Sequence, residues 1–327
     1  MPRPWPGYCC SSPWQERGCS CASRETGCSM PATDVASVSV RSPNGAVPWA
    51  RRLNPRRAAG GGLRYLVLAG ISALYLFPFV VVLTTSLKPA DEIFTLPPTL
   101  GAKRWTLDNY RAALEAMPFA RYLFNTALIS SITVVGQLLS SSIVAYSLAK
   151  IRWRGRDALL LLIIATMMLP PQVTMIPVYI GWSKIGLTGS YLPLLIPQFF
   201  GSAFFIFMLR QFFRGIPEEL LDAARVEGAS DLRIYRSVVL PLARPALVAL
   251  SIFAFMWAWT DFLLPLIYIN DPDQYTLSIG LYSFFSEHGV EWGALMAAAT
   301  LMSLPLIFVF LVGQRQFVRG IALTGIK

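Results

Sequence analysis

Six long apolar stretches recur along the 327-residue chain, and no other feature constrains its fold as strongly. A membrane-spanning helix needs about 20 largely apolar residues, because in lipid the backbone must satisfy its own hydrogen bonds. Several of the stretches contain proline, which transmembrane helices tolerate. The sequence therefore predicts an all-α, polytopic membrane protein with six transmembrane helices, at 63–86, 122–148, 157–180, 192–213, 245–270 and 292–313.

The composition supports this prediction and excludes other classes of protein. Charged residues make up 14% of the chain, whereas a soluble domain carries about 25%, so a soluble enzyme is excluded. The single histidine, His288, rules out an HExxH zinc site, and all five cysteines precede residue 29. The sequence contains no GxxxxGKS or GxxxxGKT phosphate-binding loop. We expect no metal and no cofactor on this chain, and any ATP and Mg²⁺ would be bound by a partner.

The basic residues predict the orientation in the membrane, because Lys and Arg concentrate in cytoplasmic segments. If the N-terminus is cytoplasmic, 22 of the 28 basic residues fall in inner segments or at inner helix ends, against 6 in outer segments. Both termini are therefore expected in the cytoplasm. The same distribution explains the net charge of +10 without binding of nucleic acid.

The first 62 residues differ in character from the rest. They are rich in Arg, Ser, Pro and Cys and lack an apolar period, which predicts a disordered cytoplasmic tail at 1–62 before a transmembrane domain at 63–327. They also lack the apolar stretch of a signal peptide. A start codon assigned upstream of the true one, for example Met30, explains part of this tail equally well. Cys19 and Cys21 have no matching pair at zinc-finger spacing, so no metal site is expected.

The longest cytoplasmic connection, 214–244, has the pattern of two short helices. Pro217 suits the first turn of the first helix, and Glu218, Glu219 and Asp222 place negative charge at the positive end of its dipole.

The apolar residues of this connection form a narrow stripe of small side chains. Leu221, Ala224 and Gly228 recur at i, i+3 and i+7, and Gly228 is a natural helix stop. Ser230 is suited to cap a second helix, in which Ile234 and Val238 share a face before Leu240-Pro241 ends it. An ordinary amphipathic connector accounts for this pattern. However, small residues bury little area in lipid and permit close approach of another protein's backbone, which favours a docking surface.

The same connection resembles the EAA loop of ABC-importer permeases. Asp222-Ala223-Ala224, three residues, Gly228, nine residues, Val238, one residue and Leu240-Pro241 follow the family pattern Glu-Ala-Ala-x3-Gly-x9-Ile-x-Leu-Pro. Asp222 stands for Glu and Val238 for Ile, so the acidic and apolar characters are kept. The resemblance implies an ATPase-coupling segment that comprises Glu218, Glu219, Leu221, Asp222, Ala223, Ala224, Gly228, Val238, Leu240 and Pro241.

Flanking segments extend the resemblance to residues 63–327 and narrow it to carbohydrate-uptake permeases of the maltose-G type. The segments are Ser86-Leu87-Lys88-Pro89 with Leu107-Asp108-Asn109-Tyr110, Phe124-Asn125-Thr126, Ala145-Tyr146-Ser147-Leu148-Ala149, Ile176-Pro177-Val178-Tyr179, Trp259-Thr260-Asp261-Phe262 and the C-terminal run from Gln314 to Gly320. In Trp259-Thr260-Asp261-Phe262, Thr260 replaces a common Asn. The resemblance implies the type I ABC-importer permease fold in a bacterial inner membrane.

The resemblance also implies the partners of the chain. They are a second permease that completes a heterodimer around the translocation path, an ATPase homodimer on the cytoplasmic loops, and an extracytoplasmic solute-binding protein that delivers a sugar. In such a complex the helix around Glu218–Gly228 would move as a rigid lever when the ATPases close. Gly228 would then allow a close contact between this helix and the ATPase, although a role as a simple helix cap explains the glycine as well.

Asp261 is the only acid well inside an expected span, and an intramembrane carboxylate is by default a functional candidate. Aromatic faces beside a carboxylate suit a sugar, so the expected substrate path comprises Trp257, Trp259, Asp261 and Phe262. An interfacial aromatic belt, or a carboxylate paired within the heterodimer, is the opposing interpretation.

Two rival functions are an ion-coupled secondary carrier and an ABC permease for another solute, such as a phosphate ester. A carrier normally needs several intramembrane ionisable residues, which are missing here. The tail after Gln314 is expected either to reach the ATPase or to be solvated, and His288 is given no role.

Overall fold

The computed structural model describes residues 55–95, 101–286 and 289–324, with side chains at 64–95, 101–285 and 289–314. The chain divides into two units, 1–60 and 61–327, and the fold below is that of the second. The expectations for the cysteines and the start codon, and for His288, lie outside the described residues.

Three long helices are continuous over their whole length: α1 (Pro55–Ser86), α4 (Phe119–Lys150) and α15 (Trp292–Thr324). Pro78 and Pro305 lie inside α1 and α15 without ending them. The first helix begins at Pro55, so the prediction of a disordered tail up to residue 62 extends too far. The apolar segment of α1, Arg64–Ser86, has none of its residues buried in its most hydrophobic window.

The other three expected spans are broken. Helices α5 (Arg156–Thr166) and α6 (Pro171–Lys184) meet at 96°, because Pro170 and Pro171 interrupt the hydrogen-bond ladder between them. The next span consists of α7 (Leu192–Leu195), the 3-10 helix η1 (Ile196–Phe200) and α8 (Ala203–Arg214). The fifth consists of α12 (Arg244–Thr260) and α13 (Leu263–Tyr268).

The described residues therefore contain four helices long and apolar enough to cross a membrane, if Leu192–Arg214 is counted as one helix despite its irregular middle. They contain up to six spans if each of two bent pairs also counts as one. The second bent pair joins Asp231–Leu242 to α12 at 78°. The exact number of six and the cytoplasmic position of both termini stay predictions.

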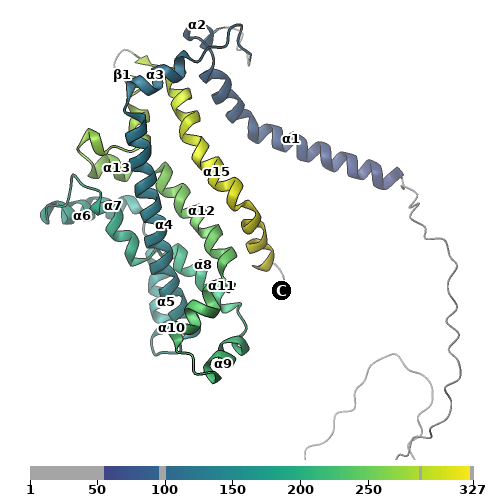
Figure 1. The fold of residues 1–327 in the computed structure, drawn as a ribbon, viewed down its shortest axis with the longest axis vertical. Coiled ribbons are helices and arrows are strands. Elements are labelled where there is room, and N and C mark those ends of the chain that lie inside the picture. The colour runs from purple at the N-terminus through teal and green to yellow at the C-terminus, as the bar shows by residue number, and fades with distance from the viewer. Residues whose placement is uncertain (1–54, 96–100, 287–288, 325–327) are drawn as a thin grey trace, which may run out of the picture. The chain divides into compact units, whose positions relative to one another are not determined.

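Helix α4 is the centre of the packing. It contacts α8 and α12 along its length, and α12 contacts α15 (Figure 1). Two buried clusters hold these helices together. One includes Phe205, Leu209 and Val239 toward the end at which α4 stops, and the other includes Trp259, Ala297 and Met302 toward the end at which it starts.

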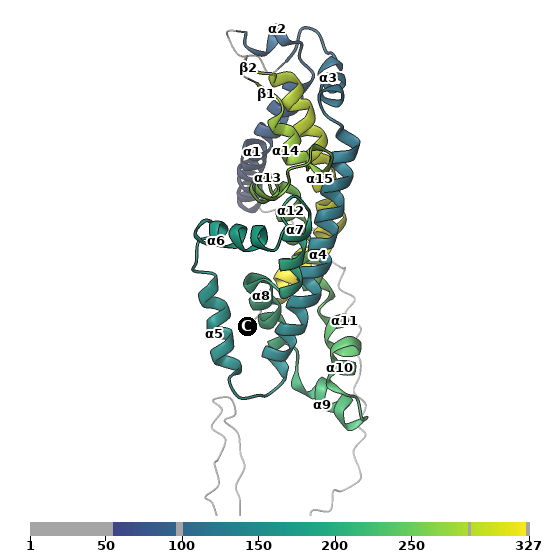
Figure 2. The same cartoon turned by 90° about the vertical axis from the view of Figure 1, so that its left-hand side faces the viewer.

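The connections gather at the two ends of α4 (Figure 2). One end carries α9 (Glu218–Val226), α10 (Asp231–Ile234), the π-helical segment η2 (Tyr235–Val239) and α11 (Leu240–Leu242). The other end carries α2 (Ala90–Ile93), α3 (Asp108–Ala116), η3 (Pro272–Gln274), α14 (Leu277–Tyr282) and the antiparallel strands β1 (Phe285–Ser286) and β2 (Gly289–Val290), in which Phe285 pairs with Val290. This arrangement agrees with connections on opposite sides of a membrane.

Residues 86–89 and 107–110, two segments before α4 that resemble the permease family, are hydrogen-bonded to each other. Asn109 Nδ2 donates to the carbonyl oxygens of Ser86, at 2.9 Å, and Lys88, at 2.7 Å. The hydroxyls of Ser86 and Tyr110 lie 2.8 Å apart. These bonds fasten the end of α1 to α3.

Candidate functional site

Helix α9 forms where the sequence predicts the first helix of the 214–244 connection. It follows Pro217 and carries Glu218 and Glu219 in its first turn, where the helix dipole favours negative charge. The prediction of a helix at this position is confirmed by the geometry.

Two of the three stripe residues, Leu221 and Ala224, face inward, whereas Gly228 is exposed, and this corrects the expected orientation of the first two. Leu221 is fully buried, and Ala224 packs partly buried against the cluster that contains Ile234 and Val239. Because these side chains cover the chain's own core, they do not present an outer docking face. The exposed members of the expected coupling segment are Glu218, Glu219, Asp222, Ala223, Gly228 and Pro241, with Val238 and Leu240 half-buried.

Gly228 ends α9 through its backbone conformation. Its φ is +81°, a left-handed value that favours glycine. Gly228 N–H donates to Arg225 O at 2.9 Å, and Ala229 N–H donates to Ala224 O at 3.0 Å, the two bonds of a Schellman cap. A Cβ added at Gly228 would meet no atom of this chain within 4 Å. Strain in the turn, rather than a clash inside the chain, is therefore the local reason for glycine.

The second helix starts as predicted and ends later. Ser230 caps it, and its side chain accepts a hydrogen bond from Arg233 N–H. The sequence predicts an end at Leu240-Pro241, but the helix continues through Pro241 to Leu242. It does so because Pro241 lies in the first turn of a new α-helical segment after the π-helical one, where the missing proline N–H costs little.

A lysine that the sequence analysis missed holds α9 in place. Lys150 is the last residue of α4, and 1% of its side chain is exposed. Its Nζ donates to Glu218 Oε1 at 2.8 Å and to the carbonyl oxygen of Ile216 at 2.7 Å. The charge also lies at the negative end of the α4 dipole. In the sequence, Lys150 contributes only to the predicted orientation in the membrane. Its position directly after an apolar run could also have indicated a lysine at the end of a helix, close to the cytoplasmic connection.

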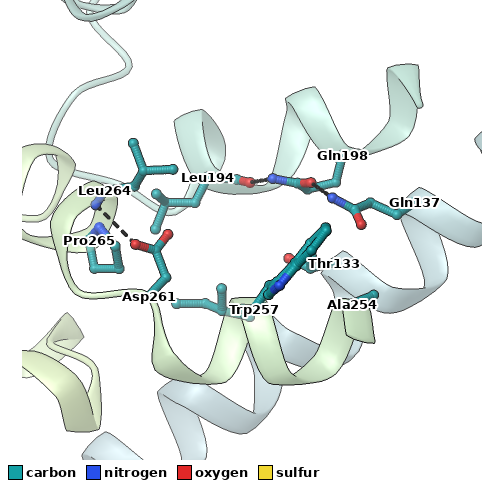
Figure 3. A pocket seen from close by; sticks show the side chains of 11 residues that line it. Thr133, Gln137, Leu194, Gln198, Ala254, Trp257, Asp261, Leu264 and Pro265 are labelled. Carbon is teal, nitrogen blue, oxygen red and sulfur yellow. Dashed lines mark hydrogen bonds between the residues drawn. The ribbon is translucent and has the colours of Figure 1, made fainter. Parts of the chain in front are cut away.

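The second candidate site is a cavity in the helical bundle (Figure 3). It encloses about 110 Å³, which is room for several water molecules. Side chains from α4, α7, η1, α12 and the start of α13 line it. Among these are Thr133, Gln137, Gln198, Trp257 and Asp261.

Asp261 lies in the break between α12 and α13. Its backbone is extended, with φ −65° and ψ 122°, and its Oδ1 accepts a hydrogen bond from Leu264 N–H at 3.3 Å. Broken helices at membrane depth are typical of ligand sites in transporters. The carboxylate and Trp257 line the same cavity, so the structure brings these two expected path residues together (Figure 3).

The other two expected path residues lie elsewhere. Trp259 is 2% exposed, stacks on Phe255, and its Nε1–H donates to Met302 O at 3.0 Å. Phe262 is half-buried, and its ring contacts Tyr282. Neither is among the residues that line the cavity.

Two glutamines of the cavity were not among the expected path residues, which were an acid and its aromatic neighbours. Gln137 and Gln198 are hydrogen-bonded side chain to side chain, and Gln198 Nε2 also donates to Leu194 O at 3.0 Å. Gly136 allows this approach, since a Cβ there would lie 3.1 Å from the ring of Phe199. Amides in the middle of expected spans were the signal available.

The cavity offers hydrogen bonds, an aromatic surface and a carboxylate. No group of three or more His, Cys, Asp or Glu residues that could hold a metal occurs in the described part of the chain. This arrangement suits binding and passage of a polar solute.

Comparison with known proteins identifies the class of this chain. Residues 137–323 match the family described as binding-protein-dependent transport system inner membrane component. The arabinooligosaccharides transport system permease protein AraQ of Bacillus subtilis is 33% identical over 79% of this chain and 92% of its own length. The sn-glycerol-3-phosphate transport system permease protein UgpE of Pectobacterium atrosepticum is 33% identical over 78% of this chain and 93% of its own length.

A solved structure supports the fold. One chain of a bacterial ABC transporter involved in the import of the acidic polysaccharide alginate superposes with a TM-score of 0.70 and 24% identity, over 80% of this chain and 97% of that chain. The chain belongs to the binding-protein-dependent transport system inner membrane component family. It is a multi-pass ABC transporter permease, a transport subunit rather than an enzyme.

Proposed function

We propose that this permease serves an ATP-driven carbohydrate importer in a bacterial inner membrane, and that a separate ATPase docks on its α9 segment. The observation that carries the proposal is the geometry of α9. One face is fixed to α4 through Lys150 and to the core through Leu221, while the other face is exposed.

The exposed face has the character of a docking surface. Val226 is 89% exposed and Leu220 47% exposed, next to the acidic side chains of Glu219 and Asp222. Exposed apolar residues rimmed by charge are typical of protein–protein contacts. Because the opposite face of α9 is fixed to α4 and to the core, a partner that pushes on the exposed face moves α9 and the end of α4 together.

The proposed complex contains four kinds of component. A second permease forms a heterodimer with this chain. An ATPase homodimer carries ATP and Mg²⁺, and an extracytoplasmic binding protein delivers the sugar. Both termini of the permease are cytoplasmic in this arrangement.

Carbohydrate is the favoured solute class. AraQ is described as a permease for arabinooligosaccharides, and AmyC of Thermoanaerobacterium thermosulfurigenes, 31% identical, as a probable permease for starch degradation products. UgpE makes sn-glycerol-3-phosphate the competing candidate. Membership in this family decides against the ion-coupled carrier.

Co-purification tests the proposal. The full chain, tagged and extracted from its native membrane, is expected to bring with it a second permease and an ATPase, and the recovered complex is expected to hydrolyse ATP. Recovery of the chain alone, with uptake that does not need ATP, would contradict the proposal.

A matched pair of variants locates the docking surface. Val226→Asp is expected to reduce the amount of ATPase recovered, because it places a charge in the apolar part of the contact. Leu107→Asp is the control, since Leu107 is 69% exposed and directly precedes α3, which lies at the opposite end of α4. Equal recovery of the ATPase with both variants would place the docking surface elsewhere.

A further inference from the structure

We infer that the cavity beside Asp261 is a hydrogen-bond acceptor site for a neutral, polyhydroxylated solute, in which the side-chain oxygen of Gln137 is the specificity-determining group. The inference rests on the proposed function. It adds that the substrate is uncharged and that Gln137 accepts a hydrogen bond from one of its hydroxyl groups.

The direction of the amide hydrogen bonds is fixed by a backbone carbonyl. Leu194 O is only an acceptor, so the Gln198 side chain must present its Nε2 to it, at 3.0 Å. The Oε1 of Gln198 then faces Gln137 and accepts from Gln137 Nε2. The orientation of both amides therefore follows from one carbonyl.

These two amide hydrogen bonds leave the side-chain oxygen of Gln137 without a partner in the described part of the chain. Gln137 Oε1 is buried and has no hydrogen-bond partner among the described residues. An unpaired buried polar atom is costly, so this oxygen calls for a hydrogen-bond donor, which either a water molecule or a hydroxyl group of a solute can supply. The oxygen belongs to a residue that lines the cavity (Figure 3).

The second acceptor is the carboxylate of Asp261. Its Oδ1 is engaged by Leu264 N–H, and a carboxylate has further lone pairs to offer. Gln137 of α4 and Asp261 in the break after α12 therefore bring two acceptor-bearing side chains to the lining of one cavity. Hydroxyl groups satisfy such acceptors by donating hydrogen bonds to them.

The charge of the cavity opposes an anionic solute. Its lining residues include one carboxylate and no Lys, Arg or His. A phosphate ester or an acidic sugar would bring a second negative charge into a partly dehydrated space without a cation to balance it, which is unfavourable. Trp257 adds an aromatic face, 51% exposed, against which the C–H surface of a sugar ring can pack.

The test uses the complete importer with its binding protein, reconstituted in proteoliposomes. Its probes are labelled arabinotriose and maltotriose as neutral solutes and sn-glycerol-3-phosphate as an anionic one. ATP-dependent accumulation of a neutral probe in preference to sn-glycerol-3-phosphate is expected. Gln137→Met removes the acceptor at similar size, together with the donor to Gln198 Oε1. It is expected to raise the KM for that probe about five- to tenfold, the effect of one lost hydrogen bond to the solute.

Gln211→Met is the matched control, because Gln211 lies exposed near the end of α8 and outside the cavity. The yield and the melting temperature of the complex should be the same in all variants, which separates a binding defect from misfolding. An unchanged KM in Gln137→Met would overturn the inference alone, whereas preferred accumulation of sn-glycerol-3-phosphate would overturn both the inference and the proposed carbohydrate importer. Failure to accumulate any probe with ATP would instead overturn the proposed carbohydrate importer.

Discussion

Lys150 Nζ lies 2.8 Å from Glu218 Oε1, so the last residue of α4 is joined directly to the first residue of α9. The two ends of this contact differ in burial, since the lysine side chain is 1% exposed and the glutamate side chain 52%. Substitutions at the two positions should therefore have unequal effects.

Lys150→Met is expected to destabilise the 214–244 connection by about 1–3 kcal/mol, because it leaves the carbonyl oxygen of Ile216 without its donor in a buried place. Glu218→Gln is expected to cost about 0–1 kcal/mol, since the glutamate is half exposed and water screens the pair. The melting temperature of the purified complex measures the difference. The double variant Lys150→Glu with Glu218→Lys should not recover the loss, because glutamate cannot donate to Ile216 O. Full recovery would show that charge attraction alone matters.

Gly228→Asp is expected to abolish uptake while the permease stays in the membrane. Gly228→Asn decides between the two roles of this glycine, because Asn tolerates the left-handed backbone better than other residues do. If close contact with the ATPase requires glycine, both variants lose solute-stimulated ATP hydrolysis. Normal hydrolysis in Gly228→Asn would reduce Gly228 to a helix cap. Gly228→Ala serves as the measure of backbone strain, at about 1–2 kcal/mol.

Asp261→Asn tests whether the charge in the cavity matters apart from its structural hydrogen bond. An Asn side-chain oxygen can still accept from Leu264 N–H, so the break between α12 and α13 should be preserved. Uptake of the neutral sugar is expected to weaken through a higher KM, with the amount of assembled complex unchanged. Unchanged uptake kinetics would remove Asp261 from the substrate path.

Trp257 and Trp259 form a natural pair for comparison, because they lie two residues apart and differ in burial. Trp259→Phe is expected to lower stability by about 1–3 kcal/mol through loss of the hydrogen bond to Met302 O and of packing volume. Trp257→Phe is expected to change transport with little change in stability. Thermal unfolding and uptake, measured on both variants, check this assignment, and the opposite pattern would refute it.

Much of this fold is predictable, because lipid demands long apolar helices and because α9 carries its own signals in Pro217, Glu218 and Gly228. The breaks are not. Pro78 and Pro305 lie in continuous helices, whereas Pro170 and Pro171 separate two helices at 96°. Whether a proline bends a spanning helix depends on which neighbours accept the freed carbonyls, and that information is tertiary.

The candidate site shows the same limit. An apolar stripe such as Leu221 and Ala224 indicates a covered face but not whether the chain itself or a partner covers it. A span that is apolar on all sides gives no rotational phase, so Trp259 could not be assigned to the core from the sequence. The pairing of Gln137 with Gln198 joins residues far apart in the chain, and no local pattern reports it.

The continuity of α4 has a mechanical consequence. Gln137 and Lys150 lie on one uninterrupted helix, about 20 Å apart along its axis at 1.5 Å per residue. A tilt of α4 by about 10° around its Lys150 end would displace the Gln137 end by about 3 Å, comparable to the length of a hydrogen bond. Motion imposed at α9 would therefore reach the cavity as rotation of a single rod, without a relay of side-chain rearrangements between them.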